Sequence, residues 1–144
     1  MNFDEYYFKS ANYSSYLERG ERYLKMAEEL DDLFCKLKII KKDSRIVDYG
    51  CAVGFLISAL EKIGYTNIFG YDISEWAIAQ AEKRGCKILK DCNWNHARAD
   101  LMFCLDVFEH MEDKDITSLL TKKDRKSTRL NSSHVSESRM PSSA

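Results

Sequence analysis

The fold is decided by one continuous stretch, Arg45-Ile46-Val47-Asp48-Tyr49-Gly50-Cys51-Ala52-Val53-Gly54. Its first five residues contain the β-branched pair Ile46-Val47 and the aromatic Tyr49, which predicts a short buried strand. The seven residues from Asp48 to Gly54 predict a tight glycine turn, and an apolar stripe from Phe55 to Ile63 predicts a helix that ends at Gly64. A strand, a turn and a helix in this order open a βαβ unit.

The same alternation extends on both sides of this stretch. Further strands are expected over residues 67–72, 86–89 and 99–105, with a helix over 75–84 capped by Ser74 and another helix starting at Glu112 or Asp113. An amphipathic pattern predicts a long helix over residues 14–37. We therefore expect an α/β fold, a three-layer αβα Rossmann-like arrangement with a mostly parallel sheet, incomplete because only its first four strands are present.

The glycine turn lies where such a fold binds ligands, beyond the carboxyl end of the first strand. A dinucleotide site would show Gly-x-Gly-x-x-Gly, whereas Gly50 and Gly54 are four residues apart, with Ala52 between them and Phe55 following. The carboxylate of Asp48 suits a cationic ligand better than a pyrophosphate. The turn therefore excludes a dinucleotide and favours a ligand with positive charge.

Residues 47–54 resemble the first motif of class I S-adenosylmethionine-dependent methyltransferases, two hydrophobic residues followed by Asp-x-Gly-x-Gly-x-Gly. Residues 70–74 resemble the family's second motif, and residues 100–110 resemble its fourth-strand segment. The resemblance covers Arg45 to Thr117 and implies a methyltransferase with S-adenosyl-L-methionine as cofactor. Ala52 replaces the family's middle glycine, and its methyl group is expected to permit the turn only with a negative φ.

The resemblance also implies which residues hold the cofactor. Asp72 would accept hydrogen bonds from both ribose hydroxyls through its two carboxylate oxygens. The segment Lys90-Asp91-Cys92 would lie beside the adenine amino group. The full set of cofactor-binding residues implied by the resemblance is Asp48, Gly50, Cys51, Ala52, Gly54, Asp72, Ile73, Asp91, Cys92 and Asp106.

The sequence indicates catalytic residues less clearly than cofactor-binding ones, because methyl transfer needs a general base only for a hydroxyl or a protonated amine acceptor. His110 is the one candidate base, although a histidine at a helix entry more often bonds to nearby backbone. Glu109 is interpreted as a structural carboxylate, and Tyr6 and Tyr7 could close over the methionine end. The acceptor is expected to be a small molecule. Two alternatives stay open, a cofactor-binding chain without catalysis and an aminopropyl transferase of the same fold.

The composition of the chain bears on its partners, its location and the presence of a metal site. The net charge of −1 gives no electrostatic case for nucleic acid or an anionic membrane. No apolar run approaches the roughly 20 residues of a membrane span, and the start of the chain lacks a signal-peptide pattern, so a cytoplasmic protein is expected. The five cysteines show no disulfide framework, and Cys86, Cys92 and His96 lack the paired spacing of a metal site, so no metal is expected.

The sequence divides into three parts. Residues 1–43 form an N-terminal helical segment, residues 44–123 the S-adenosylmethionine-binding half of a domain, and residues 124–144 a serine-rich tail expected to be disordered. The tail resembles translated sequencing-adaptor DNA, which we interpret as a non-native read-through that cuts the natural sequence short. The strand over 99–105 would then be a bare apolar edge, and the fragment is expected to be poorly soluble or inactive.

Overall fold

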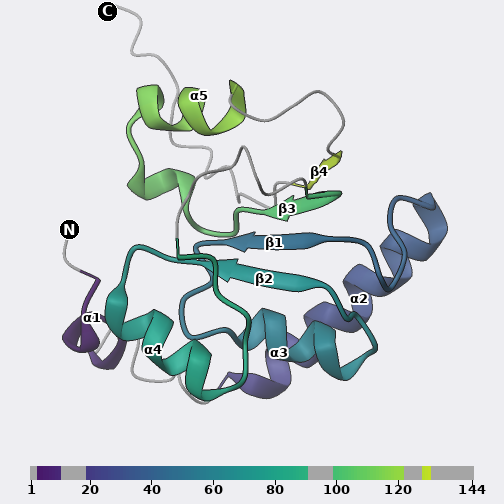
Figure 1. Ribbon diagram of the computed structural model, residues 1–144, viewed down its shortest axis with the longest axis horizontal. Coiled ribbons are helices and arrows are strands. Elements are labelled where there is room, and N and C mark those ends of the chain that lie inside the picture. Colours follow the sequence, from purple (N-terminus) through teal and green to yellow (C-terminus); the bar gives the residue numbers. More distant parts are fainter. Residues whose placement is uncertain (1–2, 11–18, 91–98, 122–127, 131–144) are drawn as a thin grey trace, which may run out of the picture.

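The computed structural model describes residues 3–10, 19–90, 99–121 and 128–130 (Figure 1). Its centre is a parallel sheet with the strand order β2-β1-β3-β4. The four strands are β1 (Ile46–Tyr49), β2 (Ile68–Tyr71), β3 (Leu101–Phe103) and β4 (Thr128–Leu130). The expected parallel α/β sheet is confirmed.

Helices connect and cover these strands. Ser74 caps α4 as expected, because its hydroxyl oxygen accepts a hydrogen bond from the Ala77 backbone N–H at 3.1 Å. The helical elements of the described residues are α1 (Glu5–Lys9), α2 (Gly20–Leu37), α3 (Phe55–Lys62), α4 (Glu75–Lys83), the short 3₁₀ helix η3 (Phe108–His110) and α5 (Asp113–Thr121).

Alternate residues of each strand face opposite layers of helices. Ile46 and Phe103 pack with Phe34 of α2 and with apolar residues of α3. Their neighbours Val47 and Met102 point the other way and pack with buried Leu119 of α5. Figure 1 shows α5 separated from the group formed by α2, α3 and α4. This period of two, with helices on both faces, confirms the expected three-layer arrangement.

Two expected elements differ from the structure. The strand expected over 86–89 is reduced to an isolated parallel bridge between Ile88 and Gly70, with hydrogen bonds from Gly70 N–H to the Lys87 carbonyl and from Leu89 N–H to the Gly70 carbonyl. The helix expected from Ser14 begins instead at Gly20, and residues 14–18 lie outside the described ones. A glycine is less costly at such a helix start than in a helix interior.

The tail also departs from expectation. Of residues 124–144 the structure describes only Thr128–Leu130, which pair in parallel with Leu101–Phe103. The expectation of a bare edge at β3 is therefore wrong, because β4 covers it. The tail was also expected to have no regular structure, and these three residues form a strand instead. An apolar strand edge is a template for any segment that can supply backbone hydrogen bonds, which accounts for the pairing.

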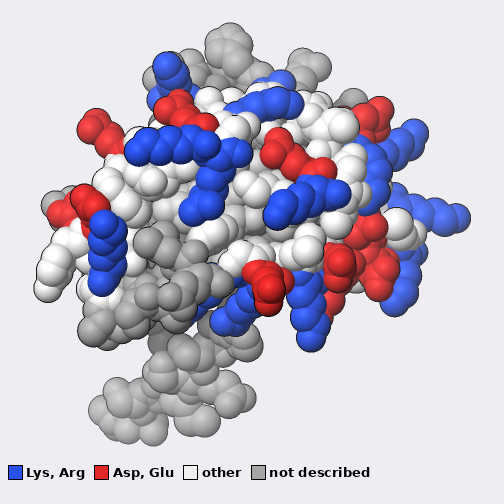
Figure 2. Space-filling view, turned by 90° about the horizontal axis from the view of Figure 1, so that it is seen from below, with Lys and Arg blue, Asp and Glu red and all other residues white. Residues whose placement is uncertain are grey.

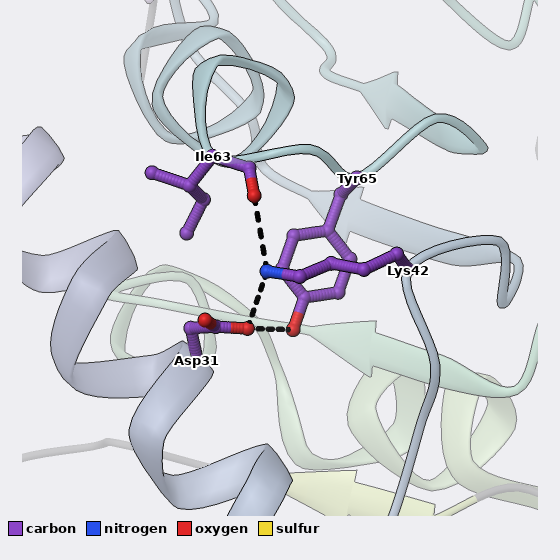
Figure 3. A network of polar contacts seen from close by, with 4 residues as sticks. All are labelled: Asp31, Lys42, Ile63 and Tyr65. Carbon is purple, nitrogen blue, oxygen red and sulfur yellow. Dashed lines mark hydrogen bonds and ion pairs between the residues drawn. The ribbon is translucent and has the colours of Figure 1, made fainter.

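A polar network fixes the long helix α2 against the connection between α3 and β2 (Figure 3). Asp31 of α2 accepts hydrogen bonds from the Lys42 ammonium at 2.6 Å and from the Tyr65 hydroxyl at 2.8 Å. Lys42 also donates to the Ile63 carbonyl at 3.0 Å and lies 4.2 Å from the centre of the Tyr65 ring. These hydrogen bonds lower the pKa of Asp31. The network therefore locks the C-terminal half of α2 in place.

Candidate functional site

A cavity of about 330 Å³ opens at the carboxyl ends of the strands. One wall, which we call the strand-end wall, is built from the residues that follow β1, β2 and β3, including Gly50, Asp72 and Asp106. A second wall, which we call the helical wall, is supplied by Phe3, Tyr7 and Phe8 around α1 and by Arg19, Tyr23 and Met26 at the start of α2. The cavity size falls within the range of about 300–1,000 Å³ that is usual for small-molecule sites.

The strand-end wall depends on a backbone with positive φ angles. Gly50 has φ +82° and Gly54 has φ +83°, a region that costs glycine nothing. A Cβ at Gly50 would lie 2.3 Å from Cγ2 of Val107, so glycine is required there for a second reason. Ala52 has φ +48°, which means that the expectation of a negative φ is wrong. The turn imposes on alanine the left-handed conformation that the family's glycine adopts freely.

Asp72 holds this turn in shape. Its Oδ2 accepts a hydrogen bond from the backbone N–H of Ala52, and its Oδ1 accepts one from the backbone N–H of Ser74, both at 2.8 Å. The carboxylate therefore joins the glycine turn after β1 to the start of α4 after β2. Each oxygen retains a second lone pair, and the side chain lines the cavity, so Asp72 can still accept from a ligand.

Asp48 is a buried carboxylate beneath the turn, with 4% of its surface exposed. Among the described residues it has no hydrogen-bond partner for its side chain, although it lines the cavity. Burial first, and then the nearby charge of Asp72, raise the pKa of Asp48 to about 7. A cationic group placed against Asp48 would favour its ionised form, so the site is prepared for a positively charged ligand.

The structure brings together most of the residues predicted from the sequence. Gly54 does not line the cavity; a Cβ on it would lie 2.6 Å from Cys86 Sγ and 3.1 Å from Ala81 Cβ, so this glycine serves the packing of the turn against α4. Asp91 and Cys92 lie outside the described residues. The predicted residues that do line the cavity are Asp48, Gly50, Cys51, Ala52, Asp72, Ile73, Asp106 and His110.

His110 lies at the cavity in η3, between the two walls. Its Nε2 is 3.3 Å from a carboxylate oxygen of Glu109, and its ring meets Phe3 edge-on with 5.5 Å between ring centres. Its backbone N–H donates to the Val107 carbonyl at 3.0 Å. Tyr7 also lines the cavity, whereas Tyr6 is 81% exposed and does not. Of the two tyrosines expected near the methionine end, only Tyr7 is in position.

Sequence reasoning missed part of the helical wall. Phe3, Tyr23 and Met26 look like ordinary apolar positions in the sequence, and Arg19 looks like one of many surface charges. Only the packing of α1 and α2 onto the strand ends makes them cavity residues. The one available signal was the density of aromatic residues before residue 24, which the sequence alone cannot assign to a ligand rather than to a core.

The described residues contain no group of three or more His, Cys, Asp and Glu side chains arranged for a metal ion, and Cys92 and His96 lie outside them. No described helix is both long enough and apolar enough to cross a membrane.

A sequence profile described as a methyltransferase domain matches residues 16–122, which is most of the chain. The chain belongs to this methyltransferase-domain family. The match includes the glycine turn and the fourth-strand segment, and it confirms the resemblance drawn from the sequence. A comparison with curated protein sequences gave no match.

Solved methyltransferase structures share the fold. Magnesium protoporphyrin IX methyltransferase from Synechocystis PCC 6803 with bound SAM is 17% identical, with a TM-score of 0.55, over 80% of this chain and 65% of that one. An S-adenosylmethionine-dependent methyltransferase from Clostridium acetobutylicum ATCC 824 is 18% identical, with a TM-score of 0.59, over 76% of this chain and 49% of that one. The plantazolicin methyltransferase BpumL in complex with SAH is 21% identical, with a TM-score of 0.63, over 88% of this chain and 55% of that one. The chain thus spans about half to two thirds of the length of these methyltransferases.

Proposed function

We propose that this chain is the cofactor-binding part of an S-adenosyl-L-methionine-dependent methyltransferase that acts on a small-molecule acceptor. One observation carries the proposal: the carboxylates of Asp48 and Asp72 flank an open glycine turn inside a single cavity at the strand ends. Membership of the methyltransferase-domain family supports it. Two of the solved structures named above, magnesium protoporphyrin IX methyltransferase and BpumL, contain bound SAM or SAH, which agrees with the same cofactor here.

The residues present fit this cofactor. Asp72 has free lone pairs for a pair of ribose hydroxyls, and the exposed side chain of Ile73 at the cavity offers an apolar surface for the adenine ring. The buried carboxylate of Asp48 matches the positive charge of the methionine end. When bound, S-adenosylmethionine supplies a methyl group already activated by its sulfonium, so the task of this chain is to bind, orient and exclude water.

The acceptor side of the proposal rests on the helical wall. Aromatic rings and the side chain of Met26 cover much of that wall, which suits a small organic molecule. On the face drawn in Figure 2, Lys and Arg side chains are interspersed with Asp and Glu, so that face has no broad basic surface for a phosphate backbone. His110, whose Nε2 faces Glu109, can accept a proton from a hydroxyl acceptor at its other ring nitrogen, Nδ1.

Two other functions remain as outcomes of experiment. Ala52 with its strained φ could weaken the turn enough to leave a cofactor-binding chain without catalysis. An aminopropyl transferase would use the same fold and a related cofactor. Neither is favoured by a specific contact among the described residues.

Calorimetric titration with S-adenosylmethionine, S-adenosylhomocysteine and NAD tests the cofactor proposal. We expect the first two to bind and NAD not to bind. Asp72→Asn should weaken S-adenosylhomocysteine binding by about 10-fold or more, because one charge-assisted acceptor is lost. Asp43→Asn, at an exposed position away from the cavity, is the matched control and should change nothing. Binding of NAD in place of S-adenosylmethionine would overturn the proposal.

A second measurement separates a methyltransferase from a pure binder. The chain is incubated with S-adenosylmethionine and a panel of small hydroxyl, amine and carboxylate acceptors, and formation of S-adenosylhomocysteine is followed. Turnover that depends on the acceptor supports methyl transfer. Tight cofactor binding without turnover on any acceptor would support the non-catalytic alternative.

A further inference from the structure

The charges around the cavity are unevenly distributed. Among the described residues that line it, carboxylates occur at Asp48, Asp72, Asp106 and Glu109, whereas Arg19 is the only lysine or arginine. Asp48 lies near the carboxyl end of β1, and Asp72 and Asp106 follow β2 and β3, so these three carboxylates belong to the strand-end wall. The one permanent positive charge among these residues comes from the helical wall.

S-adenosylmethionine needs both kinds of charge. Its methionine end has an ammonium group and a sulfonium, but also an α-carboxylate, for which the strand-end wall offers no cation. A guanidinium group matches a carboxylate with two parallel N–H donors. On the basis of the function proposed above, we propose that Arg19 binds the α-carboxylate of the cofactor and so fixes the methionine end in the cavity.

The position of Arg19 is set by the packing of α2. Its carbonyl accepts the hydrogen bond of the Tyr23 N–H at 3.2 Å, which makes Arg19 the residue on which the helix begins. The Tyr23 ring stacks on Phe55, with 5.4 Å between ring centres and 25° between ring planes. Phe55 directly follows Gly54 and opens α3. The start of α2 is therefore held against the glycine turn.

The far half of the same helix is fixed as well. Asp31, three turns further along α2, is bonded to Lys42 and Tyr65 in the network of Figure 3. A helix held near both of its ends presents its first residue at a defined position. The half-buried Arg19 side chain is thereby a positioning group for the cofactor. On binding, this side chain loses less conformational freedom than a fully exposed arginine side chain would lose.

The assignment also bears on the choice between the two transferases. An aminopropyl transferase uses S-adenosylmethionine from which this carboxylate has been removed, so that cofactor would offer the Arg19 guanidinium no carboxylate to bind. A carboxylate-binding Arg19 therefore favours methyl transfer over aminopropyl transfer.

The test compares two ligands that differ only at the amino-acid end. S-adenosylhomocysteine contains the α-carboxylate, and 5′-methylthioadenosine lacks the whole amino-acid end. Calorimetry on Arg19→Met should show S-adenosylhomocysteine binding weakened by about 10- to 100-fold, with methylthioadenosine binding changed by less than about 2-fold. Arg19→Lys should be intermediate, because a single ammonium replaces the two-pronged donor.

Arg22→Met is the matched control, since Arg22 is exposed one turn further along α2 and does not line the cavity. It should bind both ligands as the unaltered chain does. Unchanged binding of S-adenosylhomocysteine by Arg19→Met, or an equal loss for both ligands, would overturn the assignment while leaving the proposed function intact. Failure of the unaltered chain to bind S-adenosylhomocysteine would overturn both.

Discussion

The two walls of the cavity are built by different means. The strand-end wall is shaped mainly by the backbone. Asp72 accepts hydrogen bonds from the backbone N–H groups of Ala52 and Ser74, and three residues from 50 to 54 adopt positive φ. In the helical wall, side chains meet side chains, as in the edge-on contact of Phe3 with Tyr7 at 4.9 Å and the stacking of Tyr23 on Phe55.

This difference teaches where precision in the site originates. Backbone hydrogen bonds and fixed φ angles leave the strand-end wall almost no freedom, so a substitution there has to strain the chain. Ring contacts between helices can shift by small amounts at low cost. We therefore expect substitutions in the strand-end wall to change stability more than substitutions of similar size in the helical wall.

The largest effect is expected at Gly50. Gly50→Ala forces an L side chain into φ +82° and places its Cβ 2.3 Å from Val107 Cγ2. The left-handed conformation and the overpacking together should lower the free energy of unfolding by about 2–5 kcal/mol in a denaturant titration. Gly85→Ala is the matched control, with φ +88° but no atom within 4 Å, and should lose only the conformational part. Equal losses in the two variants would contradict the contact with Val107.

A smaller effect should follow the ionisation of Asp48. Its pKa in the folded chain is about 7, above its ordinary value of 3.8, because the neutral form is favoured in the buried site. The stability that Asp48 contributes is therefore fully present below about pH 4 and is lost as the pH rises through 7. Relative to the unaltered chain, Asp48→Asn should gain stability between pH 4.5 and pH 8, by an amount on the order of a few kcal/mol.

Urea titrations at both pH values measure this difference. Asp43→Asn, which alters an exposed carboxyl, should run parallel to the unaltered chain at both values. A constant gap between Asp48→Asn and the unaltered chain from pH 4.5 to 8 would show that Asp48 does not titrate in this range.

Substitutions in the helical wall should reduce stability less than substitutions in the strand-end wall. Phe3→Ala removes the ring that touches Tyr7 and His110, and should lower the free energy of unfolding by about 0.5–1.5 kcal/mol while moving the NMR signals of the His110 ring. Tyr6→Ala in the adjoining helix α1 is the control, because Tyr6 is 81% exposed, and should have no measurable effect. A loss from Phe3→Ala as large as that from Gly50→Ala would end the distinction between the walls.

The smallest effect is a gain. Ala52→Gly relieves the strain of φ +48°, which exceeds the entropy cost of the added glycine, and should raise the free energy of unfolding by about 0.5–1 kcal/mol. Ala59→Gly in the middle of α3 is the opposite control and should lower it. Destabilisation by Ala52→Gly would mean that the methyl group of Ala52 contributes packing that outweighs its strain.

The same comparison explains what the sequence could predict. The order of strands and helices, the glycine turn and the cavity residues Asp48 and Asp72 follow from patterns within a few residues, because those patterns determine the local backbone. The reduction of residues 86–89 to one bridge and the positive φ of Ala52 depend on neighbours distant in the sequence. Arg19 and Phe3 were missed for that reason, since α1 and α2 become part of the site only through packing.

The central claim is that S-adenosylmethionine binds at the strand-end wall, between Asp48 and Asp72. A titration of the isotope-labelled chain with S-adenosylhomocysteine, followed by the NMR signals of the backbone amides, tests this claim residue by residue. We predict that the amides of residues 50–54 and 72–74 shift together as the ligand is added, while those of the Asp31 and Lys42 network stay in place. Binding that leaves the amides of the glycine turn unchanged and shifts others would contradict the account.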